Sequence, residues 1–302
     1  MMIGSLDQGE LARRLRGTSL IVKLGLMNVR FGISDPASIG HFRHLYGNHM
    51  VADDGAVPDF TFTLHSQRGG RSRLARFGRM ELDGVPTTKP FEWRFAWPMF
   101  EWGLHDAVAR RGGFALMLHA SVVSRAGRAL ILPARTGSGK STLCALLVAD
   151  GWDFVSDEFL VLVRSGEQLQ VRSLPQPIAL KGRSIDILRT RFPASDWSRE
   201  WPHASKGLIR YLRPPPEGSG DVVRPGWIVL PRYQEGAGTE MTPIPRRDAF
   251  LALGPNAFNY HLRGLDGFRE AAAMVRSCRC ASLSFGDGSE AISALDIWTR
   301  QE

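Results

Sequence analysis

The sequence predicts a mixed α/β fold (α+β, with a sheet of mixed strand direction) in which a glycine-rich loop joins a strand to a helix. Three observations support this prediction. An apolar run at 129–133 leads through Gly137 and Gly139 into a helical pattern. Residues 1 to about 110 instead show short apolar alternations separated by Gly, Asp and Pro, which are typical of strands. The pattern changes near residue 111, so we expect a smaller β-rich region over 1–110 and an α/β domain over 111–302.

Length and composition fit a globular protein. The chain has 302 residues, of which 43% are hydrophobic and 23% are charged, enough for one large domain or two modest ones. Its apolar runs fall short of the roughly 18 residues that cross a bilayer, and the N-terminal SLIVKLGLMNV is interrupted by Lys23 and lacks a small-residue cleavage site. We therefore expect a cytoplasmic protein without a membrane partner.

The cysteines and the clustered histidines give no metal or disulfide pattern. Cys144, Cys278 and Cys280 are odd in number and have no CxxC spacing, so we expect buried thiols. A second group does not define a tetrahedral ligand set, so we favour packing roles for it over a metal site. Its members are His41, His44, His49, Asp53 and Asp54.

The chain is basic, with 38 Lys and Arg against 30 Asp and Glu and a net charge of +8. This charge favours anionic partners, whether nucleotides, acidic proteins or nucleic acid, without choosing among them. The densest arginine stretch contains one aromatic residue, Phe77, so it lacks the stacking platform of a single-strand binder. We expect a solvated loop or a docking surface for an acidic protein there, and nucleic acid is disfavoured. The arginines are Arg68, Arg71, Arg73, Arg76 and Arg79.

Other elements follow from local patterns. In the first half we expect one helix near 36–47 and strands that include 61–65 and 91–97. LMLHASVVS, a turn at Arg125 to Gly127, and RALILPA predict a β-hairpin whose second strand enters the glycine-rich loop. We expect a Pro/Gly-rich connection at 213–220. After it we expect a strand at 227–231 and helices near 246–253 and 266–276.

The loop Ala134 to Ser141 fits the pattern G-x-x-x-x-G-K-[ST] at every fixed position except the first, where Ala replaces Gly. It lies between an expected strand and an expected helix, as this phosphate-binding motif requires. The helix is indicated by Leu143, Leu146 and Leu147 on one face, with Gly151 as its C-terminal cap. The flanking elements disfavour the alternative of a glycine turn without a ligand.

Each residue type in the loop suits nucleotide phosphates. Gly137 and Gly139 can adopt positive φ, which lets backbone N–H groups converge on phosphate oxygens at a helix N-terminus. Lys140 would neutralise the β and γ phosphates, and the Ser141 hydroxyl would bind Mg²⁺. We therefore expect ATP and Mg²⁺ as ligands. The nucleotide-binding residues are Thr136, Gly137, Ser138, Gly139, Lys140, Ser141 and Thr142.

An acidic pair follows unusually soon. Asp157 and Glu158 in VSDE come 17 and 18 residues after Lys140, which leaves room for one helix and one turn, so the next strand along the chain must carry them. Asp157 could hold Mg²⁺, with Ser141, either directly or through water, and Glu158 could accept the proton of an attacking hydroxyl. The alternative is two solvated carboxylates at a strand end.

These motifs together resemble one family. His119 in LHAS lies 21 residues before Lys140, and GSGKS and VSDE follow. This arrangement resembles HPr kinase/phosphorylase and the HPr kinase-related proteins. The resemblance covers about residues 115–190 and is weaker through PQPIALK and the end of the chain. The resemblance implies a kinase domain of the HPr kinase and phosphoenolpyruvate carboxykinase type. It implies that Asp157 matches the first aspartate of the family's pair, that Glu158 matches the second and is the general base, and that His119 orients or tunes it. The family has Asp where Glu158 stands, and its glycine-rich RGLG-like signature is not found downstream, so the resemblance does not name HPr as acceptor.

The sequence thus predicts an ATP- and Mg²⁺-dependent kinase that phosphorylates a hydroxyl group. The expected acceptor is a serine of a protein or peptide, or else a small metabolite. The alternative is a nucleotide-binding regulatory module that transfers nothing and binds a partner protein. The residues leave the oligomeric state open, and the family resemblance points to a homo-oligomer. The acceptor is not identified, and residues that could approach it lie in the first half or in the loops over 181–220. The cations there that could contact substrate are Lys181, Arg183, Lys206 and Arg210.

Overall fold

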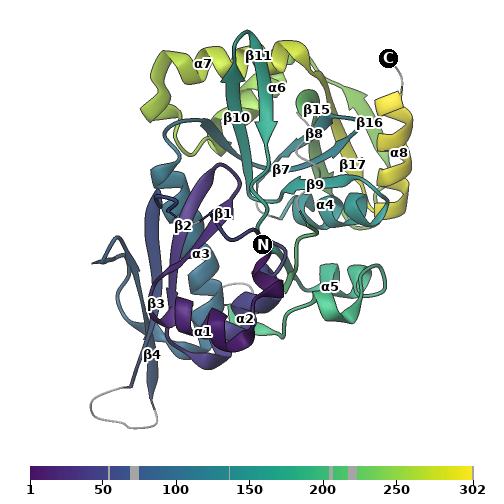
Figure 1. Cartoon of the computed structure of the whole chain (residues 1–302). Coiled ribbons are helices and arrows are strands. Elements are labelled where there is room, and N and C mark those ends of the chain that lie inside the picture. The colour runs from purple at the N-terminus through teal and green to yellow at the C-terminus, as the bar shows by residue number, and fades with distance from the viewer. Residues whose placement is uncertain (54, 69–74, 136, 204–206, 217–222, 301–302) are drawn as a thin grey trace. The chain divides into compact units, whose positions relative to one another are not determined.

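The computed structural model describes residues 1–302 except 54, 69–74, 136, 204–206, 217–222 and 301–302, and for His261 only the backbone. The chain forms two compact units that are not consecutive segments (Figure 1). The first unit comprises Met1–Arg111, Pro177–Asp186 and Pro193–Pro216, and the second comprises Gly112–Gln176, Ile187–Phe192 and Glu217–Glu302. Two segments from the second half of the sequence thus belong to the first unit. The functional division at residue 110 stays a prediction.

The first unit contains two sheets. In the larger one the strands run in the order β1-β2-β3-β4-β5, with β6 paired to β4, and β2 is parallel to β3 while the other pairs are antiparallel. The smaller one has the order β12-β14-β13. The strands are β1 (Leu20–Leu24), β2 (Met27–Ile33), β3 (Phe60–Arg68), β4 (Arg76–Leu82), β5 (Val85–Pro86), β6 (Phe91–Glu92), β12 (Ile178–Lys181), β13 (Trp201–His203) and β14 (Gly207–Leu212).

Three α-helices pack in this unit: α1 (Gln8–Arg16), α2 (Pro36–Tyr46) and α3 (Ala96–Arg111). The helix predicted near 36–47 is confirmed as α2, which Asp35 caps by accepting from the Ser38 N–H. The strand predicted over 91–97 is wrong beyond Glu92, because a 3₁₀ turn and then α3 follow it. Short aromatic alternation does not distinguish a strand from the buried face of a helix. Neither α1 nor α3 was predicted from the sequence.

The second unit is built on one eight-stranded sheet. Its strand order is β11-β10-β7-β8-β15-β17-β16, with β9 also paired to β7. β15 lies between β8 and β17 and is parallel to both, whereas the other pairs are antiparallel. The mixed α/β fold class with sheets of both strand directions is confirmed. The strands are β7 (Leu116–Arg125), β8 (Arg128–Pro133), β9 (Asp153–Ser156), β10 (Phe159–Ser165), β11 (Gln168–Arg172), β15 (Arg224–Tyr233), β16 (Glu240–Pro243) and β17 (Arg279–Phe285).

Helices cover both faces of this sheet. Ala129 and Ile131 of β8 belong to the core cluster that includes residues of α6 (Arg246–Leu253) and α7 (Tyr260–Ser277). Leu130 and Leu132 alternate with them, point to the other face and are equally buried. On that face α4 (Lys140–Ala149) packs beside α8 (Gly288–Arg300). Burial on both sides explains why β8 is almost entirely apolar. Figure 1 shows these layers.

Several local predictions for this unit are confirmed. β7 and β8 form the predicted hairpin, and the two-residue turn has positive φ at Ala126 (50°) and Gly127 (72°), as a tight hairpin turn requires. The apolar run at 227–231 lies within β15. The helices predicted near 246–253 and 266–276 are α6 and α7, with α7 beginning six residues earlier than expected and breaking at Gly264. One short helix, α5 (Arg183–Leu188), bridges the sequence boundary between the units.

Two further expectations concern the thiols and membranes. Cys144, Cys278 and Cys280 are free and buried, as expected. Burial raises the pKa of the Cys278 thiol to about 12, which keeps it protonated at neutral pH. Within the described part of the chain, every helix is too short or too polar to span a bilayer.

Candidate active site

The glycine-rich loop begins where β8 ends and leads directly into α4. Gly137 and Gly139 have φ of 92° and 87°, in the left-handed region that glycine alone adopts without strain. Gly139 is also the residue immediately before α4, whose first N–H groups have no partner within the helix. Thr136 lies outside the described residues. The loop therefore presents backbone donors at a helix N-terminus, as the sequence predicted.

The loop helix is held in place by its apolar face. Leu143, Leu146 and Leu147 are all buried, and Gly151 follows the helix with φ of 91°. Lys140, the first residue of α4, is buried as well, with an exposed fraction of 6%. A buried ammonium needs a compensating partner. That partner is the acidic segment, because Lys140 Nζ donates to the backbone carbonyl of Asp157 at 3.1 Å.

The strand register explains how the acidic pair reaches the loop. Both β9 and β10 pair with β7, and Ser156 lies opposite Val122 while Phe159 lies opposite His119. Two residues on each strand separate these pairs. Asp157 and Glu158 therefore occupy a break between two strands that run along the same edge of β7. The short spacing from Lys140 follows from this arrangement, since β9 is the next strand after α4.

Asp157 is the buried member of the acidic pair, with an exposed fraction of 2%. The Ser121 hydroxyl donates a hydrogen bond to its Oδ1, while its Oδ2 is buried without a hydrogen-bond partner. Burial raises the pKa of Asp157 to about 6; the Lys140 charge opposes this shift and the Glu158 charge adds to it. Ser141 lies close enough to lower the pKa of the same carboxyl. The carboxyl is thus set deep beside the loop lysine.

Glu158 is the accessible member. Its Oε2 lies 3.1 Å from His119 Nε2, and both side chains are about one-quarter exposed, at 25% and 27%. The His119 ring stands beside Phe258, with 5.8 Å between centroids. A carboxylate that is partly exposed and oriented by an imidazole can accept a proton from a group arriving from solvent. The structure therefore brings the three predicted catalytic residues together with Lys140 and Ser141 of the predicted nucleotide-binding set.

Two residues of the site were missed in the sequence. Ser121 lies two positions after His119 on β7, so it shares its face, and this period of two could have indicated it. Phe258 reaches the site from the segment before α7, where its N–H donates to the Met117 carbonyl at 3.0 Å. Asn259 anchors that segment, accepting from the Met117 N–H and donating to the Ala115 carbonyl. No local signal in the sequence links 258–259 to His119.

The other candidate cations do not belong to the second unit or are not described. Lys181, Arg183 and Arg210 belong to the first unit, and Lys206 lies outside the described residues. Arg210 Nε donates to the Ser198 carbonyl at 2.8 Å. The site described above lies entirely in the second unit.

His41 and Arg76, from the clustered histidines and arginines of the first unit, make packing and ion-pair contacts within that unit. His41 lies between Trp97 and Trp201, and burial lowers its pKa to about 3. Arg76 pairs with Asp35 and covers the Trp93 ring. Asp54, Arg71 and Arg73 lie outside the described residues. Across the described residues, no group of three or more His, Cys, Asp or Glu side chains is arranged to hold a metal ion. A magnesium site is not of that type, since it uses one or two carboxylates together with phosphate oxygens and water.

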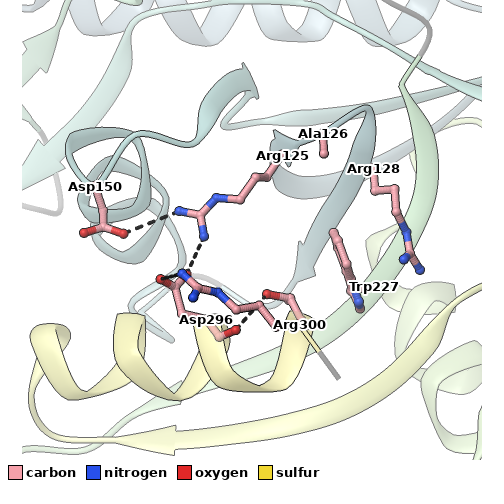
Figure 2. A pocket seen from close by; sticks show the side chains of 8 residues that line it. Arg125, Ala126, Arg128, Asp150, Trp227, Asp296 and Arg300 are labelled. Atoms are coloured by element: carbon pink, nitrogen blue, oxygen red, sulfur yellow. Dashed lines mark hydrogen bonds and ion pairs between the residues drawn. The ribbon is translucent and has the colours of Figure 1, made fainter. Parts of the chain in front are cut away.

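A cavity of about 480 Å³ lies at the opposite end of the β7–β8 hairpin (Figure 2). Arg125 joins its two sides, 2.7 Å from Asp296 on α8 and 3.5 Å from Asp150 after α4. Both helices end here, so their negative dipole ends face this region. Mixed charge and two helix C-termini do not favour a nucleotide phosphate, and we assign this network a structural role. The lining residues are Arg125, Ala126, Arg128, Asp150, Trp227, Asp296, Thr299 and Arg300.

Comparison with known proteins adds no relative. No protein-family model matches the chain, and no curated protein is significantly similar to it. Any function must therefore be argued from the site itself.

Proposed function

We propose that this chain is an ATP- and Mg²⁺-dependent kinase that transfers the γ-phosphoryl group to a hydroxyl, with serine of a protein or peptide as the expected acceptor. A single observation carries the proposal: the glycine loop, the buried lysine and both acidic residues converge on one edge of one sheet. Lys140 contacts Asp157, Asp157 contacts Ser121, and Glu158 contacts His119. Phosphate binding, metal binding and proton transfer need these three kinds of group together.

The loop residues fit a nucleotide. Positive φ at Gly137 and Gly139 is a backbone conformation with which glycine loops form anion-binding concavities. Ser138 Oγ is buried and has no hydrogen-bond partner in the described structure. A buried hydroxyl without a partner costs free energy, and a phosphate oxygen over the loop would satisfy it. Lys140 lies immediately behind, where its charge can neutralise the terminal phosphates.

The residues around Asp157 fit a magnesium ion. Its Oδ2 is buried and unpaired, although a buried carboxylate oxygen normally has a partner. Ser141, the next residue after the lysine, lies beside the same carboxyl. One carboxylate and one hydroxyl, completed by phosphate oxygens and water, suit the oxygen preference of this ion. When bound there, Mg²⁺ would neutralise charge on the transferring phosphoryl group.

Glu158 is the residue proposed to accept the proton of the attacking hydroxyl. It is more exposed than Asp157, so an acceptor can approach it from solvent. The glutamate arm is one methylene longer than an aspartate, which adds a rotamer that must be fixed. The 3.1 Å contact with His119 Nε2 fixes it, so His119 acts as a positioning residue. The resemblance to HPr kinase-related proteins supports the same roles.

The direct test is transfer from γ-labelled ATP with Mg²⁺ into a fractionated lysate of the cells that make the protein. We expect the wild-type chain to label an acceptor, Glu158→Gln to lose labelling while still binding ATP, and Lys140→Ala to lose both. Glu167→Gln serves as a matched control, because this exposed glutamate lies in the β10–β11 turn, away from the site. If wild type binds ATP and labels nothing, the kinase is refuted and a nucleotide-sensing module is favoured.

A further inference from the structure

The loop has a second flank, formed by the ends of two parallel strands. β15 is the parallel neighbour of β8 and β17 is the parallel neighbour of β15 (Figure 1). Their carboxyl ends therefore lie at the same edge of the sheet as the loop. Aromatic residues end both strands, Tyr233 in β15 and Phe285 in β17.

Tyr233 touches the loop itself. Its N–H donates to the Ser138 carbonyl at 2.9 Å. A Cβ added to Gly139 would come within 2.9 Å of the Tyr233 Cβ and 3.1 Å of the Phe285 ring. The backbone of the phosphate loop and the base of the tyrosine side chain are thus in direct contact, and only a glycine allows this approach.

The Tyr233 ring is supported and yet accessible. Its centroid lies 5.7 Å from that of Phe285, with 67° between the ring planes. Phe285 is 3% exposed, whereas Tyr233 is 38% exposed. An exposed aromatic ring offers a flat face on which the base of a ligand can stack. The ring is held from the core side and open on the other.

The site has a direction, which decides which end of a nucleotide reaches this ring. In the strand order β10-β7-β8-β15, the acidic pair borders the loop from the β7 side and Tyr233 borders it from the β15 side. The terminal phosphate belongs beside Lys140 and Asp157. The acceptor needs the space at Glu158, on the β7 side of the loop. The nucleoside must therefore leave the loop on the β15 flank.

We propose that Tyr233 is the base platform of the nucleotide site, stacking its exposed ring on the purine of the bound nucleoside triphosphate. The inference rests on the nucleotide binding in the proposed function, and not on phosphoryl transfer. Because every base has a π-face, stacking on one aromatic ring is tolerant of base identity. We therefore expect ATP and GTP to depend on Tyr233 alike.

The test compares a nucleotide with its phosphates alone. The dissociation constants of Mg·ATP, Mg·GTP and Mg·inorganic triphosphate are measured by calorimetry for full-length wild type, Tyr233→Ala and Tyr233→Phe. Alanine keeps the backbone hydrogen bond to Ser138 and removes only the ring. Ile297→Ala is the matched control, because Ile297 is an exposed apolar residue of α8 beside Asp296 of the cavity at the far end of the hairpin.

For Tyr233→Ala we expect ATP and GTP to bind roughly 5- to 100-fold more weakly, with triphosphate binding unchanged. Tyr233→Phe and Ile297→Ala should bind all three probes as wild type does. Equal weakening of ATP and triphosphate would show that Tyr233 only shapes the loop, and undiminished ATP binding would remove its role altogether. Either result overturns the base platform and leaves the kinase standing. If ATP affinity depends on the Tyr233 ring but no phosphoryl group is transferred, only the kinase activity is refuted. If wild type binds none of the three probes, both the base platform and the kinase are refuted.

Discussion

Glu158 and His119 form a pair across two strands, with Oε2 and Nε2 separated by 3.1 Å. The pair is possible because Phe159 lies directly opposite His119 in the β10–β7 ladder, which sets the preceding glutamate beside the imidazole. Asp157, one residue earlier, turns instead toward the buried Ser121. Two adjacent carboxylates thus have different surroundings, one buried and one accessible. Neighbouring acids with different environments are suited to different roles.

The first prediction concerns this pair as a unit. Glu158→Gln should lower kcat by roughly 10²- to 10⁴-fold, because it removes a general base, and His119→Gln should lower kcat by roughly tenfold through loss of orientation. If His119 acts through Glu158, His119→Gln should lower kcat little further in a protein that already carries Glu158→Gln. Steady-state kinetics of the single and double variants measure this coupling. Independent, multiplying effects would contradict the positioning role, and ATP affinity should stay constant throughout.

The second prediction concerns Asp157 in the metal-free protein. Burial raises its pKa to about 6 from an ordinary value of 3.8, so the folded state binds this proton more tightly than the unfolded state. The carboxyl therefore costs no stability below about pH 4, and its cost grows as pH rises toward 6 and is complete above it. The full cost is on the order of 2–3 kcal/mol. Asp157→Asn lacks this titration while retaining an oxygen that can accept from Ser121.

Denaturant unfolding in EDTA measures this difference. The unfolding free energy of wild type relative to Asp157→Asn should fall between pH 4 and pH 7 and then level off. Parallel curves for the two proteins over this range would show that Asp157 is not shifted upward. The measurement does not depend on catalytic activity, so it tests the burial of Asp157 separately from the proposed function.

The third prediction separates the arginine network from the active site. Arg125 contacts Asp150 and Asp296 (Figure 2). Its guanidinium also lies over the Trp152 ring, 4.2 Å from the ring centroid. Arg125→Ala should lower the unfolding free energy by about 1–2 kcal/mol, since it breaks a network and a cation–π contact together. Arg300→Ala is the control, because that side chain is 77% exposed and its pair with Asp296 is longer, at 3.6 Å. ATP affinity should be unchanged in both variants, and a loss of affinity in Arg125→Ala would bring the cavity back as a ligand site.

The sequence predicted those parts of the site that are local in the chain. The hairpin, the glycine loop, α4 and the acidic pair lie within about 40 residues, and each has a spacing or turn chemistry that identifies it. The period of two on β7 places Ser121 on the same face as His119, but its contact with Asp157 depends on the pairing of β9 with β7, which neither strand's sequence specifies. Phe258 lies about 140 residues from His119 along the chain, and packing alone brings it there.

The fold shows the same limit. The long parallel neighbour β15 was recognised as a strand, but its place beside β8, and hence Tyr233 beside the loop, depends on sheet order. The segments 177–186 and 193–216 fold with the first unit, although nothing in their composition separates them from the chain around them. The aromatic alternation at 91–97 indicated a strand because its period is ambiguous over so few residues, and the helical continuation to Arg111 decided the outcome.

The last prediction distinguishes the two loop glycines. Both have φ near 90°, so alanine is strained at either position by about 1–2 kcal/mol. At Gly137 an added Cβ meets no atom within 4 Å, whereas at Gly139 it meets Tyr233 at 2.9 Å. Gly139→Ala must therefore move the loop away from β15 in addition to straining it, and we expect it to weaken Mg·ATP binding at least tenfold more than Gly137→Ala does.

Calorimetric titration of the two alanine variants with Mg·ATP and with Mg·inorganic triphosphate tests this order. Gly139→Ala in a Tyr233→Ala background retains a Cβ at position 233, so the contact persists and little recovery of triphosphate binding is expected. Gly139→Ala with Tyr233→Gly removes that atom, leaves the Phe285 ring at 3.1 Å, and should recover part of the triphosphate binding that Gly139→Ala loses. If the two single variants bind equally, backbone strain alone governs the loop, and the contact between Gly139 and β15 does not contribute to phosphate binding.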